Sequence, residues 1–436
     1  MHFKRNLLLI LLLWPAIVFS QDTIKITKAE ALANMQKGNY QLKVNHEQEL
    51  SARADYRQSL ATFLPSVSAS HTAMLTTNPL MAFGFKLNQE IVGQADFNPA
   101  LLNDPDGIRD YMTKVEVMQP IINLDGIYGR TAAKSQWEAY QLQSARTRQA
   151  YEMQTEQAYL QLQLSYKALA VLSNARKTAK ENQQLGENFL KQGYLQQADL
   201  LAIQIRVQET EQQYTEALSN VRNASDYLRL LMGEEKKGNI YFPTDISDTL
   251  VNPLPEETSL NENRADLRAV ALAENAWKNM FLKEKGALLP RLNAFGWYEL
   301  HDNEIFGTSA NGYLLGASLS WKIFDGFSSW GKVEKAKAEY HKSSLEHEQY
   351  TAQSLLELQK AVRAVNDAAE AVKLARISYM QAQEAYRIRQ NRFRQGLEKV
   401  TDLLMAETMA AVKELEMQQA YFKYQVSSLY VNFLSK

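Results

Sequence analysis

Two stretches of this chain are too long to fit, as helices, inside a compact domain. Residues 126–192 and 327–395 contain no proline, and each stretch is expected to form one continuous helix. A helix of this length extends over roughly 100 Å, at about 1.5 Å per residue. The sequence therefore predicts long, paired helices rather than an ordinary globular core. The low numbers of proline (10) and glycine (18) in 436 residues support this prediction.

The chain repeats one plan twice. The letters KQGYLQQADLL, which begin at Lys191, are matched by RQGLEKVTDLL, which begin at Arg394. A proline ahead of the strands and an Asp-Gly pair after them recur at matching places. We expect a first structural repeat over residues 21–232, a linker or equatorial segment over 233–261, and a second repeat over 262–436.

Each repeat is expected to contain two strands, a long helix, a turn and a shorter helix. In the first repeat these elements are predicted at about 65–75, 113–122, 126–192, 193–199 and 196–232. In the second repeat they are predicted at about 290–301, 312–323, 327–395, 396–402 and 398–434. Both shorter helices carry residues at alternating spacings of three and four, which is typical of coiled-coil pairing. The first repeat has about 25 additional residues around 75–111, whose Asn, Pro, Asp and Gly content predicts a long loop.

The segment at 312–323 alternates between apolar residues and small or polar ones. Its length and the aromatic residues near its ends are typical of a tilted transmembrane strand with aromatic girdles at the two membrane surfaces. We expect this girdle to be formed by Trp297, Tyr298, Tyr313 and Trp321. A soluble β-hairpin packed on another element would produce the same alternation, and it stays an alternative.

The N-terminal twenty residues predict a secretory signal peptide. Lys4 and Arg5 precede an apolar run over residues 7–18, and Ser20 offers a small residue for cleavage. The chain has no cysteine, so it has no disulfide and no thiol for a lipid anchor. Its 48 basic and 49 acidic residues nearly cancel, which excludes the electrostatic footprint of a nucleic-acid-binding protein. We expect an exported protein without acylation.

Four membrane strands per chain cannot close a barrel, because open sheet edges in lipid leave backbone groups unpaired. Two chains would give a barrel filled by its own side chains, whereas three would give twelve strands and a lumen. The predicted fold class is mainly α with a membrane β-barrel portion. The chain is internally duplicated, its very long antiparallel helices form a trimeric α-helical barrel, and its four strands contribute to a shared 12-stranded barrel.

Over nearly its whole length the chain resembles the TolC family of outer-membrane efflux proteins, also called outer membrane factors. The resemblance rests on the signal peptide, the duplication, the two strands per repeat, the long helices and the pattern G-x5-D-L-L at both turns. It implies a homotrimer in the outer membrane of a Gram-negative cell, projecting into the periplasm. It also implies a passive exit duct of a tripartite efflux or type I secretion system. The implied partners are a periplasmic adaptor (membrane fusion protein), an inner-membrane pump and outer-membrane lipid.

The two repeated turns carry the candidate site. Gly193 and Gly396 are expected to end the long helices in the left-handed conformation, and Asp199 and Asp402 to lie in the first turn of the returning helices. Helix capping explains these acids without any pore. The resemblance implies instead that they line a constriction at the periplasmic tip, with Asp402 the stronger candidate. Residues expected at the turns, where the adaptor would dock, are Gly193, Gly396, Leu200, Leu403, Lys191 and Arg394.

The chain departs from the family pattern near these turns. Met405 stands where the prototype of the family has a second acid. Glu398 and Phe393 stand where the arginine and tyrosine that lock the prototype's tip are expected. A lock would then need other partners, for which Lys191, Arg392 and Arg394 are the candidates.

No catalytic or metal-binding pattern is found, and we expect neither an enzyme nor a cofactor. The sequence has no HExxH, no phosphate-binding loop and no nucleophile elbow. His341 and His347 are six residues apart and do not share a helical face at i,i+4 spacing. The alternative function is an exported periplasmic or surface coiled-coil structural protein without a channel. The transported substrate, the pump and the adaptor are not predicted.

Overall fold

The computed structural model describes residues 23–235, 239–245 and 259–436. The signal peptide predicted at 1–20 lies outside the described residues, and so does part of the linker predicted at 233–261.

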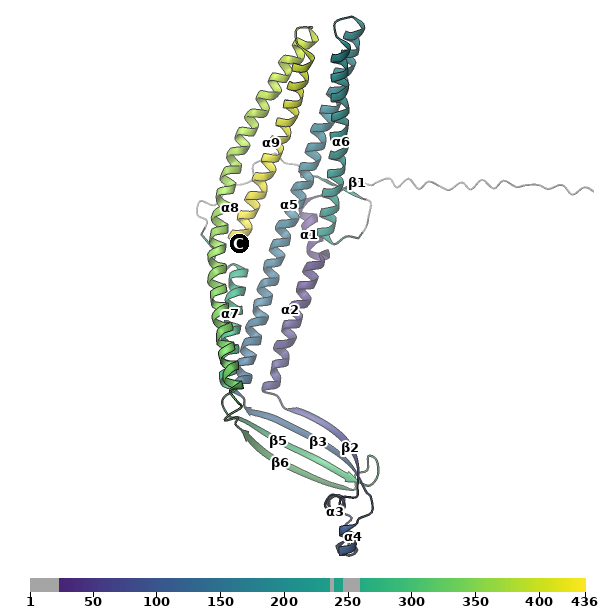
Figure 1. Ribbon diagram of the computed structural model, residues 1–436, viewed down its shortest axis with the longest axis vertical. Helices are drawn as coiled ribbons and strands as arrows, with labels where there is room; N and C mark the ends of the chain where they lie inside the picture. Colours follow the sequence, from purple (N-terminus) through teal and green to yellow (C-terminus); the bar gives the residue numbers. More distant parts are fainter. Residues whose placement is uncertain (1–22, 236–238, 246–258) are drawn as a thin grey trace, which may run out of the picture. The chain divides into compact units, whose positions relative to one another are not determined.

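Two helices dominate the described chain (Figure 1). Helix α5 (Leu124–Lys191) has 68 residues, and α8 (Ser328–Arg394) has 67. Each is followed by an antiparallel helix of 36 residues, α6 (Gln197–Met232) and α9 (Val400–Ser435). The prediction of very long antiparallel helices is confirmed. From Leu200 onward, residues of α6 at spacings of three and four are buried, apart from the partly buried Tyr214, as coiled-coil pairing requires.

The other elements are shorter. In chain order they are β1 (Thr23–Ile26), α1 (Lys28–Gly38), α2 (Tyr40–Gln58), η1 (Ser59–Thr62), β2 (Ser66–Thr76), α3 (Pro79–Asn88), η2 (Gln94–Phe97), α4 (Pro99–Asn103), β3 (Ile108–Ile122), β4 (Ile240–Pro243), α7 (Ala265–Gly286), β5 (Arg291–Asp302) and β6 (Ala310–Ser320). The segment expected to be a long loop between the first two strands therefore contains α3, η2 and α4. Among the described helices, none is both long enough and apolar enough to cross a membrane.

The chain divides into two compact units, and each combines segments of both repeats. We call the first the turn unit; its described residues fall within 23–43, 147–261 and 355–436. The second, the sheet unit, comprises 44–146 and 262–354. Helices α5 and α8 contribute residues to both units.

The turn unit consists mainly of two helical hairpins, one formed by α5 with α6 and the other by α8 with α9 (Figure 1). The first hairpin packs around Leu162 and Leu228, and the second around Leu358 and Val431, all of them almost completely buried. Burying a side chain of this size stabilises the fold by about 1.5–3 kcal/mol. Each hairpin therefore holds together through its own apolar seam.

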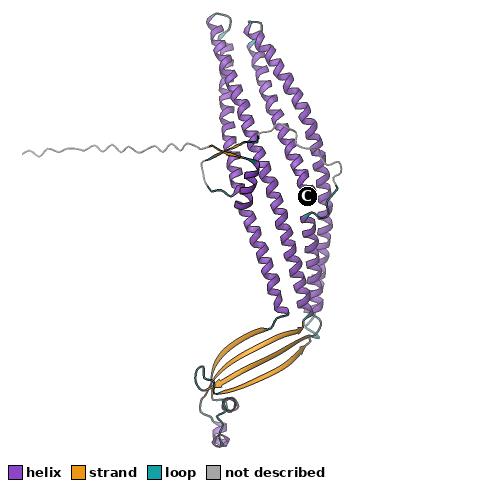
Figure 2. Ribbon diagram, turned by 180° about the vertical axis from the view of Figure 1, so that it is seen from behind, coloured by secondary structure: helices purple, strands orange, loops and turns teal. Residues whose placement is uncertain are grey.

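The sheet unit contains four antiparallel strands in the order β2-β3-β5-β6 (Figure 2). The central pairing, β3 with β5, joins the two repeats, with Val115 opposite Tyr298. Strands β2 and β6 are the edges, and within the described residues each has a neighbour on one side only. The prediction of four strands per chain is confirmed.

The two faces of this sheet differ in chemistry, because successive side chains of a strand point to opposite sides. One, which we call the apolar face, carries mainly apolar and aromatic residues: Val67, Ala69, Val115, Val117, Ala294, Tyr298, Tyr313, Leu315, Ala317 and Leu319. The other, which we call the polar face, carries mainly polar and charged residues: Ser66, Ser68, Ser70, Thr72, Asp110, Lys114, Glu116, Trp297, Glu299, His301 and Ser318.

A buried ionic cluster fixes the helices of the sheet unit. The Asp266 carboxylate accepts hydrogen bonds from Arg264 Nε at 2.7 Å and from the Tyr350 hydroxyl at 2.9 Å, and it pairs with Arg146 Nε at 3.1 Å. Arg264 is 1% exposed and Arg146 is 8% exposed. Because these residues lie on or beside α5, α7 and α8, the cluster ties three helices together.

Candidate functional site

The two turns of the turn unit share one backbone geometry. Gly193 has φ +79° and Gly396 has φ +73°. At each turn the glycine N–H donates to the carbonyl three residues back, and the next N–H donates to the carbonyl five residues back, all at 2.9–3.0 Å. This is the Schellman arrangement that ends a helix at a left-handed residue. It explains why the glycine recurs, because an L side chain at this φ costs roughly 1–2 kcal/mol.

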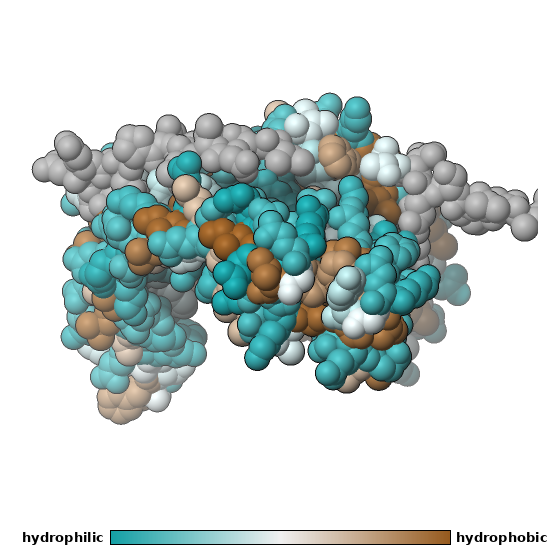
Figure 3. Space-filling view, turned by 90° about the horizontal axis from the view of Figure 1, so that it is seen from above, coloured by the Kyte–Doolittle hydropathy of each residue, from teal (hydrophilic) through white to brown (hydrophobic). Residues whose placement is uncertain are grey.

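The side chains that accompany the two turns differ. At the first turn the rings of Tyr194 and Phe189 meet edge to face, with centroids 6.5 Å apart, which is the apolar contact that commonly accompanies this motif. At the second turn Arg392 Nη2 donates to the Leu397 carbonyl at 3.3 Å. Tyr194 is 77% exposed and Leu397 is 64% exposed. Seen from the end that carries both turns, the surface is mainly hydrophilic, with hydrophobic side chains between the polar ones (Figure 3).

Asp199 and Asp402 both lie in the first turn of a returning helix, α6 and α9. Negative charge at a helix N-terminus is favoured by about 0.3–1 kcal/mol. Asp402 Oδ2 lies 3.6 Å from Arg389 Nη1, and both side chains are over a third exposed. Asp199 forms no ion pair among the described residues. The two acids therefore occupy equivalent positions but have different electrostatic surroundings.

Glu398 is the centre of an ionic cluster at the second turn. Its Oε1 lies 2.9 Å from Arg389 Nη1 and its Oε2 lies 2.8 Å from Arg392 Nε. The Glu398 side chain is 10% exposed, whereas the two arginines are about half exposed. Of the three candidate lock residues, Arg392 forms an ion pair here. Lys191 and Arg394 form none among the described residues.

The two hairpins meet close to the turns. Phe393, Val400 and Leu403 of the second hairpin form one cluster with Ile203 of the first, and each is at most 3% exposed. The rings of Phe189 and Phe393 have centroids 5.6 Å apart. Leu403 is therefore a contact between hairpins. Leu200 is also buried, beside Gly186 of its own hairpin.

One turn of helix away from this cluster, a buried polar network joins the hairpins. Glu407 of α9 is 4% exposed; its Oε2 accepts from Asn182 Nδ2 of α5 at 2.7 Å, and its Oε1 accepts from Arg206 Nε of α6 at 3.4 Å. Arg206 also pairs with Glu209 at 3.4 Å. A buried charge is tolerated only where such partners exist. We call Asn182, Arg206 and Glu407 the hairpin clasp.

The clasp perturbs the ionisation of its members. Burial raises the pKa of the Glu407 carboxyl, and the Arg206 guanidinium and the Asn182 amide offset only part of that rise. Burial, and next the negative charge of Glu407, raise the pKa of Tyr386 on α8 to about 12. All four helices of the two hairpins therefore contribute to one buried polar environment.

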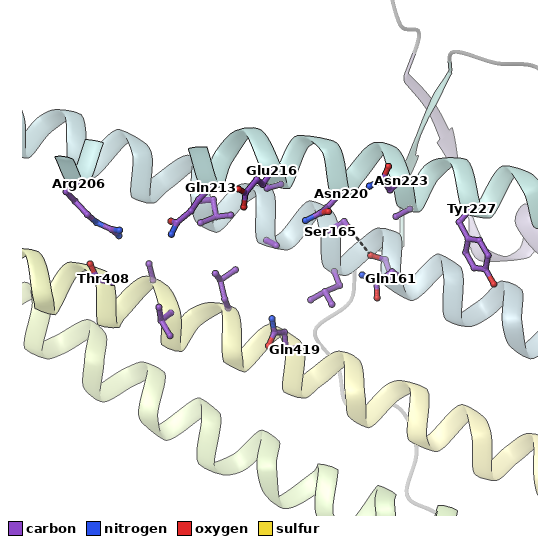
Figure 4. A pocket seen from close by; sticks show the side chains of 18 residues that line it. Gln161, Ser165, Arg206, Gln213, Glu216, Asn220, Asn223, Tyr227, Thr408 and Gln419 are labelled. Atoms are coloured by element: carbon purple, nitrogen blue, oxygen red, sulfur yellow. Dashed lines mark hydrogen bonds between the residues drawn. The ribbon is translucent and has the colours of Figure 1, made fainter. Parts of the chain in front are cut away.

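Beyond the clasp the two hairpins leave a groove of about 700 Å³ between α5, α6 and α9 (Figure 4). Its walls carry amides and small apolar residues. Gln161 and Asn220 lie on the side of the first hairpin, and Thr408 and Gln419 lie on the side of α9. A smaller groove of about 380 Å³ lies between α6 and α9, with the exposed apolar residues Ile205, Met405 and Met409 in its walls.

The four aromatic residues expected to form a membrane girdle do not share one surface. Tyr298 and Tyr313 are paired on the apolar face, and Tyr313 is 78% exposed. Trp321 follows β6 and donates its Nε1–H to the Leu288 carbonyl at 3.0 Å. Trp297 lies on the polar face, where Lys114 Nζ is 4.1 Å from the centre of its ring. Strand alternation would have separated Trp297 from Tyr298, because neighbouring residues point to opposite faces.

Sequence reasoning did not find Arg389, the clasp or the role of Phe393. Asn182, Arg206 and Glu407 lie far apart in the sequence, 225 residues between the first and last, and each fits an ordinary helix surface. Glu407 is one position after Ala406 of the α9 seam, and this position beside an apolar seam was the only signal of its burial. No group of three or more residues suited to hold a metal ion occurs among the described residues.

Comparison with known proteins gives one family. A model of the outer membrane efflux protein family matches residues 31–234 and 258–431. The two matched segments correspond to the two repeats of the chain. Curated protein sequences give no match.

Several solved structures share the fold over nearly the whole chain. The outer membrane channel CmeC of Campylobacter jejuni is 17% identical, with a TM-score of 0.79 over 93% of this chain and 85% of that one. The outer membrane protein VceC of Vibrio cholerae is 15% identical, with a TM-score of 0.78 over 94% and 96%. The open state of the outer membrane channel MtrE of Neisseria gonorrhoeae is 14% identical, with a TM-score of 0.76 over 94% and 88%.

Proposed function

We propose a detailed function for this chain on the basis of its family. The chain belongs to the outer membrane efflux protein family. Members of this family are channels and not enzymes, form trimers and work with efflux systems. The protein is accordingly an outer-membrane efflux channel that extends into the periplasm. The assembly, the gate and the partners of this particular chain are what we propose.

The chain forms a homotrimer with a shared barrel of twelve strands. The observation that carries this proposal is the four-stranded sheet, which has one apolar face and two edges, β2 and β6. Unpaired edges in lipid cost several kcal/mol for each backbone group, so β6 of one chain would pair with β2 of the next. In that barrel the apolar face contacts outer-membrane lipid, and the polar face lines the lumen. Tyr298, Tyr313 and Trp321 would supply the girdle, while Trp297 would face the lumen.

The two turns form the periplasmic tip of the duct. Threefold symmetry would bring three copies of Asp402, and three of Asp199, to one end of the helical tube. Rings of carboxylates at a constriction favour cations over anions. Arg389 lies beside Asp402 and offsets part of the negative charge of its carboxylate. Asp199 has no such neighbour among the described residues, and its carboxylate adds to the negative electrostatic field at the constriction.

The hairpin clasp and the cluster around Phe393 hold the tip closed. They join the hairpins of one chain. Opening would require the hairpins to move against each other, and a partner that binds the open tip better would shift the equilibrium. A periplasmic adaptor with its own helical hairpin suits the exposed surfaces around Gly193, Gly396, Lys191 and Arg394. An inner-membrane pump, or the transporter of a type I secretion system, would supply the substrate.

Conductance in planar bilayers tests the role of the acids. Asp402→Ala in the purified trimer is expected to weaken the preference for cations, because it removes three carboxylates from the constriction. Glu370→Ala is the matched control, since Glu370 is exposed on α8 beside Lys373 and far along the helix from the turn. Unchanged conductance and selectivity in Asp402→Ala would remove this residue from the constriction. The absence of any channel would favour a coiled-coil scaffold.

A further inference from the structure

The segment between β2 and β3, residues 77–107, packs against one end of the sheet through its first helix. Its helix α3 contacts both β3 and β6, which are not neighbours in the sheet. Three residues of α3 and its C-terminal end are buried on one side of the helix, namely Ala82, Phe85 and Gln89. Asn78 caps the N-terminus of the helix, since its side chain accepts from the Met81 N–H, and Pro79 is the first helical residue.

The residues buried beneath α3 belong to the polar face. Asp110 of β3 is 0% exposed, His301 of β5 is 4% exposed and Ala310 of β6 is 1% exposed. Most of the remaining sheet is exposed or partly exposed in the single chain. The segment therefore covers the end of the polar face that lies away from α2 and α5.

A hydrogen-bonded latch holds α3 in this position. Gln89 Nε2 donates one hydrogen to the Arg109 carbonyl at 2.7 Å and one to Asp110 Oδ1 at 3.0 Å. His301 Nδ1 lies 3.0 Å from Asp110 Oδ2, and it carries the hydrogen because a carboxylate only accepts. The Asp110 carboxylate thus connects the segment to two strands. Both donors of the Gln89 amide are used, so an apolar side chain at this position would remove both hydrogen bonds.

Two further features indicate that residues 77–107 have a defined structure. Glu90, next to Gln89, has a φ of +60° without being glycine. Such strained residues persist only where their surroundings hold them. Lys86 Nζ pairs with Asp96 Oδ1 at 2.7 Å within the segment. The segment thus has a defined structure at the outer end of the sheet.

We propose that residues 77–107 form a lid over the outer mouth of the channel, held closed by Gln89, Asp110 and His301. The proposal rests on the proposed function, because the polar face is the lumen only if the sheet joins a membrane barrel. Three lids would meet around the threefold axis at the outer mouth of the barrel. The duct then has a second closure, on the outside of the cell, that is separate from the tip.

Single cysteines test the lid, since the natural chain has none. Ser68→Cys places a thiol on the polar face, and Val67→Cys places one on the apolar face one residue away. Thr308→Cys lies in the exposed loop between β5 and β6 and reports full access from outside. Whole cells are treated with a maleimide attached to a large polymer, and the rate of labelling is measured for each position.

The Ser68→Cys protein is expected to label slowly, and Gln89→Leu in that background to raise its rate by about tenfold, because the latch loses both buried hydrogen bonds. Gln94→Leu is the matched control: it is the same substitution at an exposed position of the same segment, and it should leave the rate unchanged. Should Gln89→Leu prevent export, replacing residues 79–104 by a short glycine–serine linker gives the same increase without depending on the latch.

Two results would overturn the lid. One is labelling of Ser68→Cys as fast as Thr308→Cys in the otherwise natural chain, and the other is a rate that neither Gln89→Leu nor the shortened segment changes. Val67→Cys distinguishes failure of the lid from failure of the membrane barrel. The thiol at position 67 stays unreactive if the apolar face contacts lipid, whereas labelling as fast as Thr308→Cys would show that the sheet is not in a membrane.

Discussion

The hairpin clasp gives a quantitative test of how the tip is held closed. Removing one partner of a buried ion pair typically costs about 3–5 kcal/mol, because the other charge is left buried. Arg206→Met leaves Glu407 with the Asn182 amide alone. Since burial already raises the pKa of Glu407, proton uptake limits the loss, and we expect a cost near the lower end, about 3 kcal/mol. This energy corresponds to a change of on the order of 100-fold in the ratio of closed to open hairpins.

The partner variant and the double variant complete the cycle. Glu407→Leu leaves Arg206 paired with Glu209, which is half exposed, and deprives the Asn182 amide of its acceptor. A buried donor without a partner costs about 1–3 kcal/mol. The double variant Arg206→Met/Glu407→Leu removes both charges and places two apolar side chains together. We expect it to be less destabilised than the sum of the single variants, with an interaction energy of about 1–3 kcal/mol.

Single-channel recording in planar bilayers is the assay, with the open probability of the purified trimer as the readout. Both single variants should raise the open probability, and the double variant should restore much of the closed state. Lys413→Met is a suitable control, because Lys413 also lies on α9 but forms its ion pair with Glu416 on the same helix. Strictly additive effects, or single variants that conduct like the natural protein, would refute the role of the clasp in closing the tip.

Two further predictions concern the turns and the clasp. Gly396→Ala is expected to lower the stability of the turn unit by about 1–2 kcal/mol, because the φ of +73° is unfavourable for alanine although its Cβ would meet no atom within 4 Å. Gly331→Ala, which also meets nothing within 4 Å but has no positive φ, should instead stabilise α8 by about 0.5–1 kcal/mol in thermal unfolding, and equal effects of the two substitutions would contradict the explanation. Because burial raises the pKa of Glu407, the stability that its neutral form contributes is present at acidic pH and is lost as the pH rises through that pKa. Glu407→Gln should therefore gain stability relative to the natural chain as the pH rises through that pKa, and a difference that does not vary with pH would contradict the raised pKa.

Much of the fold follows from local patterns. A proline-free stretch such as 327–395 leaves little choice except a helix, and the repeated Gly193 and Gly396 mark where a left-handed residue must end it. The alternation in 312–323 identifies β6 and its apolar face, because the period of a strand is two. These signals each depend on a few neighbouring residues. The sequence therefore predicts the elements and the four strands well.

The contacts between hairpins could not be read in this way. Glu407 meets Asn182 and Arg206 only because the two repeats lie side by side, and nothing near Glu407 in the chain indicates a charged partner. Helix α3 could have been predicted, since Asn78 followed by Pro79 is a strong helix start. The assignment of Trp297 to the girdle rested on residue type. The alternation of the strand places it on the other face.

The central claim is that three chains share one barrel in the outer membrane. It is tested most directly by the mass of the native particle, extracted from outer membranes in mild detergent and corrected for bound detergent. Three chains per particle are expected, because only a neighbour can pair the edges β2 and β6. A single chain that fractionates with soluble periplasmic protein would contradict the claim, and Asp199 and Asp402 would then act as helix caps alone.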